Sequence, residues 1–362
     1  MKIDFIISTL RGGGAERVLS LLVNGLAKNN KFEISVITLF EGDDNYILDS
    51  SVKRVVLSGN KALPSHSFRS IVNLSKYYVN KKNRPDLIIS FITLTNFISI
   101  IVAKIFSIKI IAQEHNSHLR FMKNRKTITH ITRKYIYKRA DLITVLTSFD
   151  IEYYSKFGAH VRVMPNPCSF VPIKNNSHER KKTILAVGNL NRYHHKGLDN
   201  LIELIAPILK QNPDWTLKIA GAGDDGLKLL SGLAKKYNVV NQIIFTGFIT
   251  TISKLMQESS IFILSSRFEG LPMVLLEAMS QGMTCIAYDC KTGPSDIITN
   301  NVNGLLIEDQ NKKVMGDKLL ELMNNKALRQ SLANNGLKSL DRFDVDTIVN
   351  DYQEIFKRIL NK

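Results

Sequence analysis

Two series of short apolar runs, each alternating with helix-like stretches, constrain the fold of this 362-residue chain more than any other feature. In the first half, apolar runs of strand length occupy residues 3–7, 33–39, 87–91, 108–112 and 142–146. Amphipathic helical patterns lie between them, for example at residues 16–28 and 96–106. Because strands that alternate with helices are typical of βαβ units, we predict a parallel sheet with helices on both faces.

The same pattern starts again in the second half of the chain. Strand-like runs recur at residues 183–187, 216–220, 242–245, 261–264 and 284–287. A loop rich in Pro, Asn and Ser at residues 165–177 separates the two series and marks a domain boundary. We therefore predict two doubly wound α/β domains, at residues 1–168 and 169–345, which face each other across a cleft. Ligands of such sheets bind beyond the carboxyl ends of the strands.

The last residues, 346–362, are predicted to form a helix of their own. Its apolar side chains recur at helical spacing: Ile348, Val349, Tyr352, Ile355, Phe356 and Ile359. Because an apolar helix face needs a partner, we expect this helix to pack back on the N-terminal domain.

Cysteine content and hydropathy exclude several classes of protein. The three cysteines, Cys168, Cys285 and Cys290, have no spacing typical of a disulfide framework or a zinc site. The most apolar stretch, residues 97–103, is far shorter than the ~20 residues of a membrane-spanning helix, and the chain opens without a signal-peptide pattern. We expect a cytoplasmic protein that binds no metal and is soluble or peripheral on the cytoplasmic face of the inner membrane.

Positive charge is concentrated in the first half of the chain. Of a net charge of +17, residues 1–170 carry 25 Lys and Arg against 12 Asp and Glu. The excess peaks at residues 119–140, which contain Arg120, Lys123, Arg125, Lys126, Arg133, Lys134, Lys138 and Arg139 and no acidic residue. Apolar residues are interleaved with them: Phe121, Ile128, Ile131, Tyr135 and Ile136. This segment fits an anionic membrane surface, and the alternative is an ordinary solvated helix face.

The stretch at residues 265–279 is the most informative for chemistry. A buried strand ends just before it, and Pro272 suits the first turn of the helix that follows. Backbone amides at this helix start, those of Gly270, Leu271, Met273 and Val274, form an anion site that suits a diphosphate. Glu269 and Glu277 flank these amides, and carboxylates accept paired hydrogen bonds from sugar hydroxyls. The alternative is a helix start with acidic residues that stabilise its dipole.

These motifs resemble those of retaining glycosyltransferase family 4. Glu269 and Glu277, eight apart around Gly-Leu-Pro, resemble its Glu-x7-Glu signature. Five further segments resemble family motifs in the same order along the chain: residues 12–17, 188–197, 221–223, 245–248 and 292–305. The resemblance spans the whole chain and is strongest in the C-terminal half.

The resemblance implies a GT-B fold, in which two Rossmann-like domains hold a nucleotide-sugar donor mainly on the C-terminal one. Glu277 would accept hydrogen bonds from the ribose, and Glu269 from the transferred sugar. Arg192 and Lys196 would neutralise the diphosphate. The implied donor-binding set also includes the helix-start amides of residues 270–274 together with Gly13, Gly14, Gly188, Gly221 and Phe248. The family has Arg directly after Gly188, whereas this chain has Asn189, so Arg192 is the replacement that we predict.

His115 follows the predicted strand at residues 108–112, at the edge where ligands bind. In the resembling family a histidine here meets the donor sugar, so we predict a catalytic role together with Glu269, Arg192 and Lys196. A surface or helix-capping histidine is the alternative. Glu114 is a second polar group expected at this rim.

The function predicted from these observations is transfer of a hexose or N-acetylhexosamine, with retention, from a UDP-sugar to a glycan. The acceptor is expected to be linked to a polyprenyl diphosphate, in the assembly of capsule, O-antigen or exopolysaccharide, without a cofactor. The sequence leaves the sugar, the linkage and the choice of UDP over GDP or ADP open. The alternatives are a GT-B nucleotide-sugar isomerase and a basic nucleic-acid-binding protein, for which no binding motif is present. Two weaker patterns are Gly221–Gly226, which suggests nicotinamide binding, and Asp344-Val345-Asp346, which we interpret as a helix cap rather than a metal motif.

Overall fold

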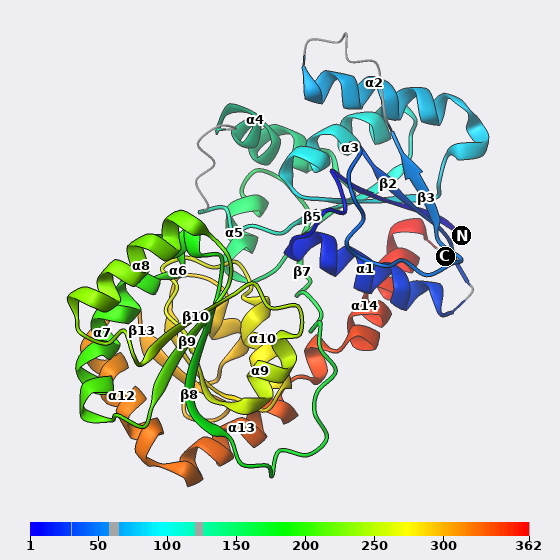
Figure 1. Cartoon of the computed structure of the whole chain (residues 1–362). Coiled ribbons are helices and arrows are strands. Elements are labelled where there is room, and N and C mark those ends of the chain that lie inside the picture. Colours follow the sequence, from blue (N-terminus) through cyan, green and yellow to red (C-terminus); the bar gives the residue numbers. More distant parts are fainter. Residues whose placement is uncertain (30, 58–64, 120–125, 362) are drawn as a thin grey trace. The chain divides into compact units, whose positions relative to one another are not determined.

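The computed structural model describes residues 1–29, 31–57, 65–119 and 126–361. The chain forms two compact units. Unit 1 comprises Met1–Ser169 and Phe343–Lys362, and unit 2 comprises Phe170–Arg342. Figure 1 shows helices on both faces of the sheet in each unit. Within the described residues, no helix is long and apolar enough to cross a membrane.

Unit 1 is built on a seven-stranded parallel sheet in the order β3-β2-β1-β4-β5-β6-β7. The strands are β1 (Lys2–Ile7), β2 (Glu33–Thr38), β3 (Lys53–Val56), β4 (Leu87–Phe91), β5 (Lys109–Glu114), β6 (Leu142–Val145) and β7 (Val161–Val163). The helices are α1 (Gly14–Ala27), α2 (His66–Val79), α3 (Thr93–Ile105), α4 (Lys126–Ile131), α5 (Phe149–Ser155) and α14 (Val345–Leu360), with short helical turns η1 (Lys81–Asn83), η3 (Thr132–Ile136) and η4 (Tyr137–Arg139). The five predicted strands are present. Two short edge strands, β3 and β7, were not predicted, because their few residues are only partly buried and give no apolar run.

Unit 2 is built on a six-stranded parallel sheet in the order β10-β9-β8-β11-β12-β13. The strands are β8 (Lys181–Val187), β9 (Thr216–Ala220), β10 (Ile243–Gly247), β11 (Ser259–Leu264), β12 (Thr284–Asp289) and β13 (Leu305–Glu308). The helices are α6 (Tyr193–Lys196), α7 (Leu198–Gln211), α8 (Asp224–Lys236), α9 (Ile252–Glu258), α10 (Met273–Ser280), α11 (Pro294–Ile297), α12 (Lys312–Asn324) and α13 (Lys326–Lys338), with short turns η5 (Leu190–Arg192) and η6 (Asp341–Phe343). β11 is buried along its whole length, as expected for a central parallel strand.

The terminal helix α14 packs against α1 within unit 1 (Figure 1). Gly25 of α1 makes this close approach possible, because a Cβ there would lie 2.7 Å from Val349 Cγ2. Phe356 is buried and meets Phe32 edge-on, with ring centroids 6.1 Å apart. The side chain of Asp344 accepts hydrogen bonds from the amides of Asp346 and Thr347, so the prediction that Asp344 caps this helix is confirmed.

The strand order fixes where side chains from different loops can meet. In each sheet the connections run outward in both directions from two central strands, β1 and β4 in unit 1 and β8 and β11 in unit 2. Loops that follow such a strand pair diverge to opposite faces and leave a crevice at the carboxyl edge, which is the usual ligand site of open α/β sheets.

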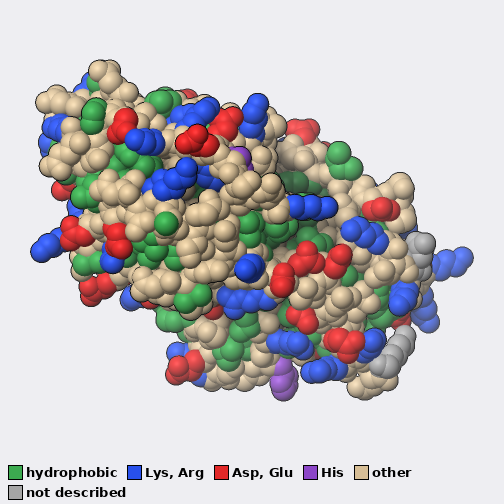
Figure 2. Space-filling model, turned by 90° about the horizontal axis from the view of Figure 1, so that it is seen from below, with side chains coloured by type: hydrophobic (Ala, Val, Ile, Leu, Met, Phe, Trp, Pro, Cys, Tyr) green, Lys and Arg blue, Asp and Glu red, His purple; other side chains and the backbone are tan. Residues whose placement is uncertain are grey.

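Surface charge is mixed on the face of the molecule that Figure 2 shows. Lys and Arg side chains are interspersed there with Asp and Glu and with small apolar patches. On that face, therefore, the net charge of +17 is not gathered into one basic region.

Candidate functional site

In unit 2 the loops after β8 and β11 meet backbone to backbone. Gly197, at the end of α6, has a φ of 63°, and a Cβ there would lie 1.9 Å from the carbonyl oxygen of Ser265. Ser265 Oγ donates to the carbonyl oxygen of Lys196 at 2.9 Å, and the Arg267 amide donates to that of His195 at 3.0 Å. The glycine thus lets the two loops lock together, which fixes the residues that each loop carries.

Lys196 and Glu269 are brought together by this packing. Lys196 Nζ lies 2.8 Å from Glu269 Oε1, and Ser266 Oγ donates to the same oxygen at 2.6 Å. The Glu269 side chain is only 9% exposed and that of Lys196 17%. Burial alone would raise the pKa of Glu269, but the Lys196 charge and the hydrogen bonds from Lys196 and Ser266 hold that pKa below its usual value. The pair is therefore an ionised carboxylate and a cation, preorganised at the carboxyl edge of the sheet.

The loop that carries Glu269 is braced from two further sides. Thr292 Oγ1 donates to the Glu269 carbonyl oxygen. Gly293, with a φ of 96°, packs so closely that a Cβ would lie 2.2 Å from the Gly270 carbonyl oxygen. Arg267 forms a bidentate ion pair with Asp199, in which Nη1 and Nη2 donate to Oδ1 and Oδ2 at 2.7 and 3.1 Å. Ser266 and Thr292 lie inside the sequence motifs, yet their partners could not be assigned from spacing.

Helix α10 begins at Met273, and Pro272 is its N-cap residue rather than a member of its first turn. The amides of Gly270, Leu271, Met273 and Val274 lie at or just before this start. A helix N-terminus offers unpaired N–H groups and a positive dipole end. Glu277 is the fifth residue of α10 and is 7% exposed.

The other residues predicted for unit 2 lie on neighbouring loops. Gly221 has a φ of 149°, and a Cβ there would lie 1.9 Å from the Gly188 carbonyl oxygen, so these glycines pack the loops after β8 and β9 together. Asn189 accepts a hydrogen bond from the Asn191 amide at 3.0 Å and so caps η5. Arg192, at the end of η5, is exposed and has no ion-pair partner among the described residues. Phe248 is 77% exposed just after β10.

In unit 1, Gly13 and Gly14 lie at the start of α1, after the loop of residues 8–12 that follows β1. Gly13 is the N-cap residue of α1, and its amide and carbonyl both contact the Tyr46 hydroxyl, at 3.4 and 3.1 Å. A Cβ at Gly14 would meet no atom within 4 Å. The backbone at Gly14 is therefore open to a ligand.

His115 follows β5 at the carboxyl edge of the unit 1 sheet. Its ring stacks on Phe91, with centroids 5.1 Å apart, and Nε2 lies 3.2 Å from Gln113 Oε1. Burial lowers the pKa of His115 to about 4, so the imidazole is neutral at pH 7. Next to Phe91, Ile92 has a φ of 72°, a strained value for a β-branched residue of the kind that clusters at functional sites.

Behind His115 lies a buried polar network that corrects two predictions. Glu114 is 2% exposed; its carboxylate accepts hydrogen bonds from Thr93 and Tyr137, each at 2.8 Å, and lies 3.9 Å from Arg133 Nε. Glu114 thus lies in the core and not at the rim. Arg133 is 4% exposed and does not belong to a surface patch, because it pairs with Glu114 and donates to the His118 carbonyl oxygen at 2.8 Å.

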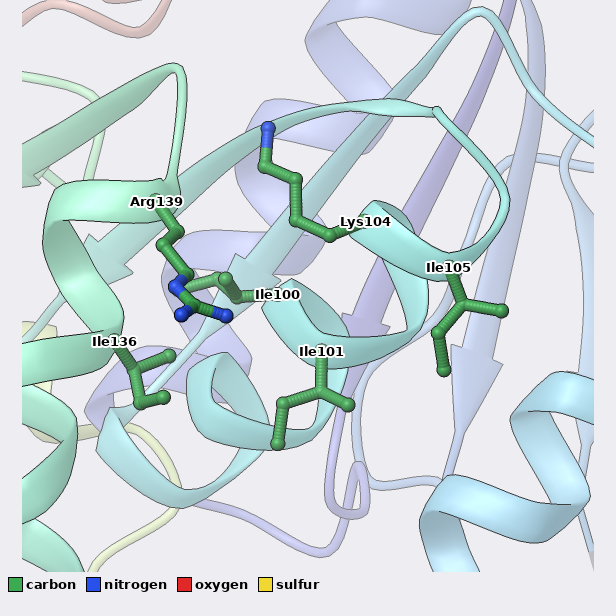
Figure 3. A pocket seen from close by; sticks show the side chains of 6 residues that line it. All are labelled: Ile100, Ile101, Lys104, Ile105, Ile136 and Arg139. Carbon is green, nitrogen blue, oxygen red and sulfur yellow. The ribbon is translucent and has the colours of Figure 1, made fainter.

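A separate pocket of about 310 Å³ lies on the side of α3 (Figure 3). Its lining consists of Ile100, Ile101, Lys104, Ile105, Ile136 and Arg139. Lys104 Nζ lies 3.4 Å from Asp141, whereas Arg139 has no ion-pair partner among the described residues. Since α3 starts after β4 and ends before β5, its last turn lies at the edge of the sheet opposite to His115. The pocket is therefore distinct from the predicted site.

Comparisons with known proteins agree with this arrangement of motifs. The family described as Glycosyltransferase Family 4 matches residues 12–169, and the family described as Glycosyl transferases group 1 matches residues 170–339. The chain is 30% identical over 370 residues to the GalNAc-alpha-(1->4)-GalNAc-alpha-(1->3)-diNAcBac-PP-undecaprenol alpha-1,4-N-acetyl-D-galactosaminyltransferase of Campylobacter jejuni, a match that covers 100% of this chain and 99% of the relative.

Solved structures share the fold at lower identity. The lipopolysaccharide outer core galactosyltransferase WaaB superposes with a TM-score of 0.77 at 23% identity, over 99% of this chain and 100% of WaaB. Anabaena Alr3699/HepE, solved in complex with UDP, gives a TM-score of 0.77 at 16% identity, over 99% and 100% of the two chains. The predicted family and fold class are confirmed. The chain belongs to glycosyltransferase family 4 and is a retaining hexosyltransferase with the GT-B fold.

Proposed function

We propose that this enzyme transfers a hexose or N-acetylhexosamine from a UDP-sugar to a glycan carried on a polyprenyl diphosphate, in surface-polysaccharide biosynthesis. The observation that carries the proposal is the buried pair of Lys196 and Glu269, held at the crevice of unit 2 beside the start of α10. A cation, a set of helix-start amides and an ionised carboxylate together match a ligand with a diphosphate and sugar hydroxyls.

In this proposal the donor is held mainly by unit 2. Lys196 and the exposed Arg192 neutralise the diphosphate, and the amides of residues 270–274 bind its oxygens. Glu269 accepts hydrogen bonds from the transferred sugar, and Glu277 accepts them from the ribose. Gly188, Gly221 and Phe248 line the nucleotide side.

From unit 1 we assign to the donor the backbone at Gly13 and Gly14, which is open at Gly14, and the ring of His115. Glycine lacks a Cβ, so a phosphate oxygen can approach the amide directly. The neutral His115 ring supplies a hydrogen bond to a sugar hydroxyl without adding a charge.

The chemical step that we propose is transfer on one face of the sugar. The bond between the anomeric carbon and the diphosphate oxygen breaks, the acceptor oxygen bonds to the same face of that carbon, and the acceptor proton passes to the departing phosphate. Lys196, Arg192 and the α10 amides stabilise the charge that develops on the leaving group. Glu269 is held by Lys196 and Ser266 and is thus an acceptor of hydrogen bonds rather than a nucleophile.

The choice of donor and acceptor draws support from the relatives. The Campylobacter jejuni enzyme is named for an N-acetylgalactosaminyl transfer to an undecaprenol-linked glycan, and Anabaena Alr3699/HepE was solved with UDP. A surface-polysaccharide role is in line with WaaB, which is named for the lipopolysaccharide outer core.

The side of unit 1 that carries the α3 pocket is where we propose contact with an anionic membrane surface. Lys138 and Arg139 are exposed, and Ile105, Ile131 and Tyr135 expose apolar surface near them, 61%, 39% and 47% respectively. Figure 3 shows the Arg139 guanidinium reaching from η4 toward the isoleucines of α3. Residues 120–125 of the basic segment lie outside the described residues.

Binding to lipid vesicles tests the membrane part. We expect co-sedimentation with vesicles that contain phosphatidylglycerol and not with phosphatidylcholine alone, at low salt. Lys104→Glu combined with Arg139→Glu should weaken binding, since each basic residue near an anionic surface contributes about 1 kcal/mol. Lys181→Glu, at an exposed site of unit 2, is the matched control. Equal binding to both vesicle types would remove membrane contact from the proposal.

A transfer assay tests the proposed reaction. The enzyme is offered UDP-GalNAc, UDP-GlcNAc, UDP-Gal and UDP-Glc with a short-chain polyprenyl-diphosphate glycan, and product and UDP are quantified. We expect one donor to be used, an α-linked product from the α-linked donor, and rapid UDP release only when the acceptor is present. Conversion of one UDP-sugar into another without acceptor would instead identify a nucleotide-sugar isomerase.

A further inference from the structure

A second histidine in unit 1, His118, is held by an aspartate in a way that the functions above do not use. His118 Nδ1 lies 2.6 Å from Asp150 Oδ1, and the side chains are 16% and 5% exposed. The same oxygen accepts the His118 amide at 2.8 Å and Ser117 Oγ at 3.2 Å. The backbone bond alone would tether the loop, so the bond to the ring adds a fixed orientation of the imidazole.

The tautomer of His118 follows from its partner. An ionised carboxylate only accepts hydrogen bonds, so Nδ1 carries the proton. The other ring nitrogen, Nε2, is then left for a ligand. No residue in the described part of the chain donates to it.

The ring is also fixed by stacking and by its backbone. It lies parallel to Tyr153, with centroids 4.1 Å apart, and to Phe149, with centroids 5.3 Å apart. Arg133, anchored by Glu114, holds the His118 carbonyl oxygen. A group whose rotamer is locked by several partners is preorganised, which is what a binding residue needs.

The surroundings of His118 match the surface of a sugar. Phe149 is 43% exposed and Leu119 is 40% exposed, so an apolar ring face lies beside the polar edge of the imidazole. A pyranose has both an apolar C–H face and hydroxyl donors, and sites for such ligands combine aromatic surface with a few fixed polar groups. His118 lies in the same loop as His115, and Asp150 follows the neighbouring strand β6. Both therefore lie at the carboxyl edge of the sheet.

We propose that His118 is an acceptor-binding residue, whose Nε2 forms a hydrogen bond with an acceptor sugar hydroxyl while the sugar ring rests on Phe149. Asp150 is a positioning residue, because it acts only through the orientation of His118. The inference rests on the proposed transferase reaction and names the part of unit 1 that recognises its acceptor.

The test separates acceptor binding from donor binding. His118→Gln, Asp150→Asn and Phe149→Leu are compared with Phe68→Leu, an exposed aromatic of α2 in unit 1 outside this cluster. We measure acceptor KM and kcat, the slow acceptor-independent hydrolysis of the UDP-sugar, and UDP affinity. We expect kcat/KM for the acceptor to fall about 10- to 100-fold in His118→Gln, as for loss of one hydrogen bond in a desolvated site. We expect a similar fall in Asp150→Asn and a smaller one in Phe149→Leu. Hydrolysis and UDP affinity should stay unchanged in all three variants.

Two outcomes would overturn the assignment. One is unchanged acceptor kinetics in folded His118→Gln; the other is a parallel loss of transfer, hydrolysis and UDP affinity. If His118→Gln fails to fold, the test depends on Phe149→Leu, because the Phe149 ring is exposed and the fold should tolerate its replacement. An unchanged acceptor KM in Phe149→Leu would then reject the site. A wild-type enzyme that transfers no sugar to any glycan would instead contradict the proposed function.

Discussion

The two sheets share one pattern of strand order, but charged side chains are placed differently at their carboxyl edges. In unit 2 the edge displays charge: Lys196 and Glu269 pair at 2.8 Å among the residues predicted to bind the donor. In unit 1 the edge residues predicted to bind the donor are glycines and the neutral His115, whereas the charged pair of Glu114 and Arg133 is buried behind them.

This difference follows from what each edge is proposed to do. A diphosphate needs fixed cations and amides, and a buried carboxylate keeps such a lysine in place before the ligand arrives. A second surface that meets the donor through backbone amides and a neutral imidazole gains hydrogen bonds without the desolvation cost of more charges. In unit 1 the charged Arg133 has a structural role: it donates a hydrogen bond to the His118 carbonyl oxygen and so stabilises the loop that begins at His115.

The largest expected effect comes from breaking the pair in unit 2. Lys196→Met leaves Glu269 buried without its cation, which we expect to cost roughly 3–5 kcal/mol of unfolding free energy. Transfer should fall about 10²- to 10³-fold, as for loss of one preorganised electrostatic group. Urea unfolding and kcat measurements check the two values.

The double variant Lys196→Met with Glu269→Gln sharpens this prediction. Because no lone charge is then buried, much of the stability should return, while transfer stays lost. Recovery of transfer together with stability would mean that the pair only supports the fold.

A smaller effect is expected at the start of α1 in unit 1. Gly14→Ala meets no atom and suits a helix, so the protein should become slightly more stable, by about 0.4–1 kcal/mol. If a donor phosphate approaches this backbone, the added methyl should lower kcat/KM roughly tenfold, or about 1.4 kcal/mol. Thermal melts and donor kinetics measure both. A stabilised enzyme with unchanged kinetics would remove Gly14 from the donor site.

The neutrality of His115 predicts a modest dependence of stability on pH. Its pKa is about 4 when folded and about 6.5 when unfolded, so between these values the unfolded chain binds the extra proton. His115 therefore costs stability as the pH falls from 6.5 to 4, and not above 6.5. The difference in Tm between His115→Gln and wild type should shift in favour of the variant by a few degrees between pH 7.5 and pH 5. A constant difference would mean that the folded ring titrates normally.

The smallest effect is expected at an exposed pair in unit 2. Lys181 and Glu258 lie 2.7 Å apart, but Lys181 is 65% exposed. Lys181→Ala should cost less than about 1 kcal/mol and leave transfer unchanged. A loss comparable to that of Lys196→Met would show that burial does not distinguish the two pairs.

The sequence predicted the central strands well, because strands buried on both faces read as apolar runs. β13 was not predicted, and neither were β3 and β7. For β13 the reason is that Leu305–Glu308 is short and directly follows a glycine, so it gives no clear apolar run. The motif around Glu269 could be predicted, but its hydrogen bonds from Ser266 and Thr292 depend on loop packing that spacing does not reveal.

The assignment of Arg133 to a surface patch was wrong for a definable reason. Between Lys126 and Arg139 the chain passes from an α-helix through a π-helical turn to a 3-10 turn. Each change alters the angle between successive side chains, so a periodicity of 3.6 no longer tells which ones point inward. His118 was missed because nothing in the sequence pairs it with Asp150, which lies 32 residues away.

The central claim is that unit 2 holds a nucleotide diphosphate through the crevice beside α10, with Glu277 on the ribose. The most direct measurement is the shift in Tm caused by UDP, GDP, ADP and CMP in wild type and in Glu277→Ala. A ligand that binds only the folded state raises Tm by mass action. We predict selective stabilisation by UDP that is lost in a folded Glu277→Ala. An equal response to UDP in both proteins, or none to any nucleotide, would contradict the claim.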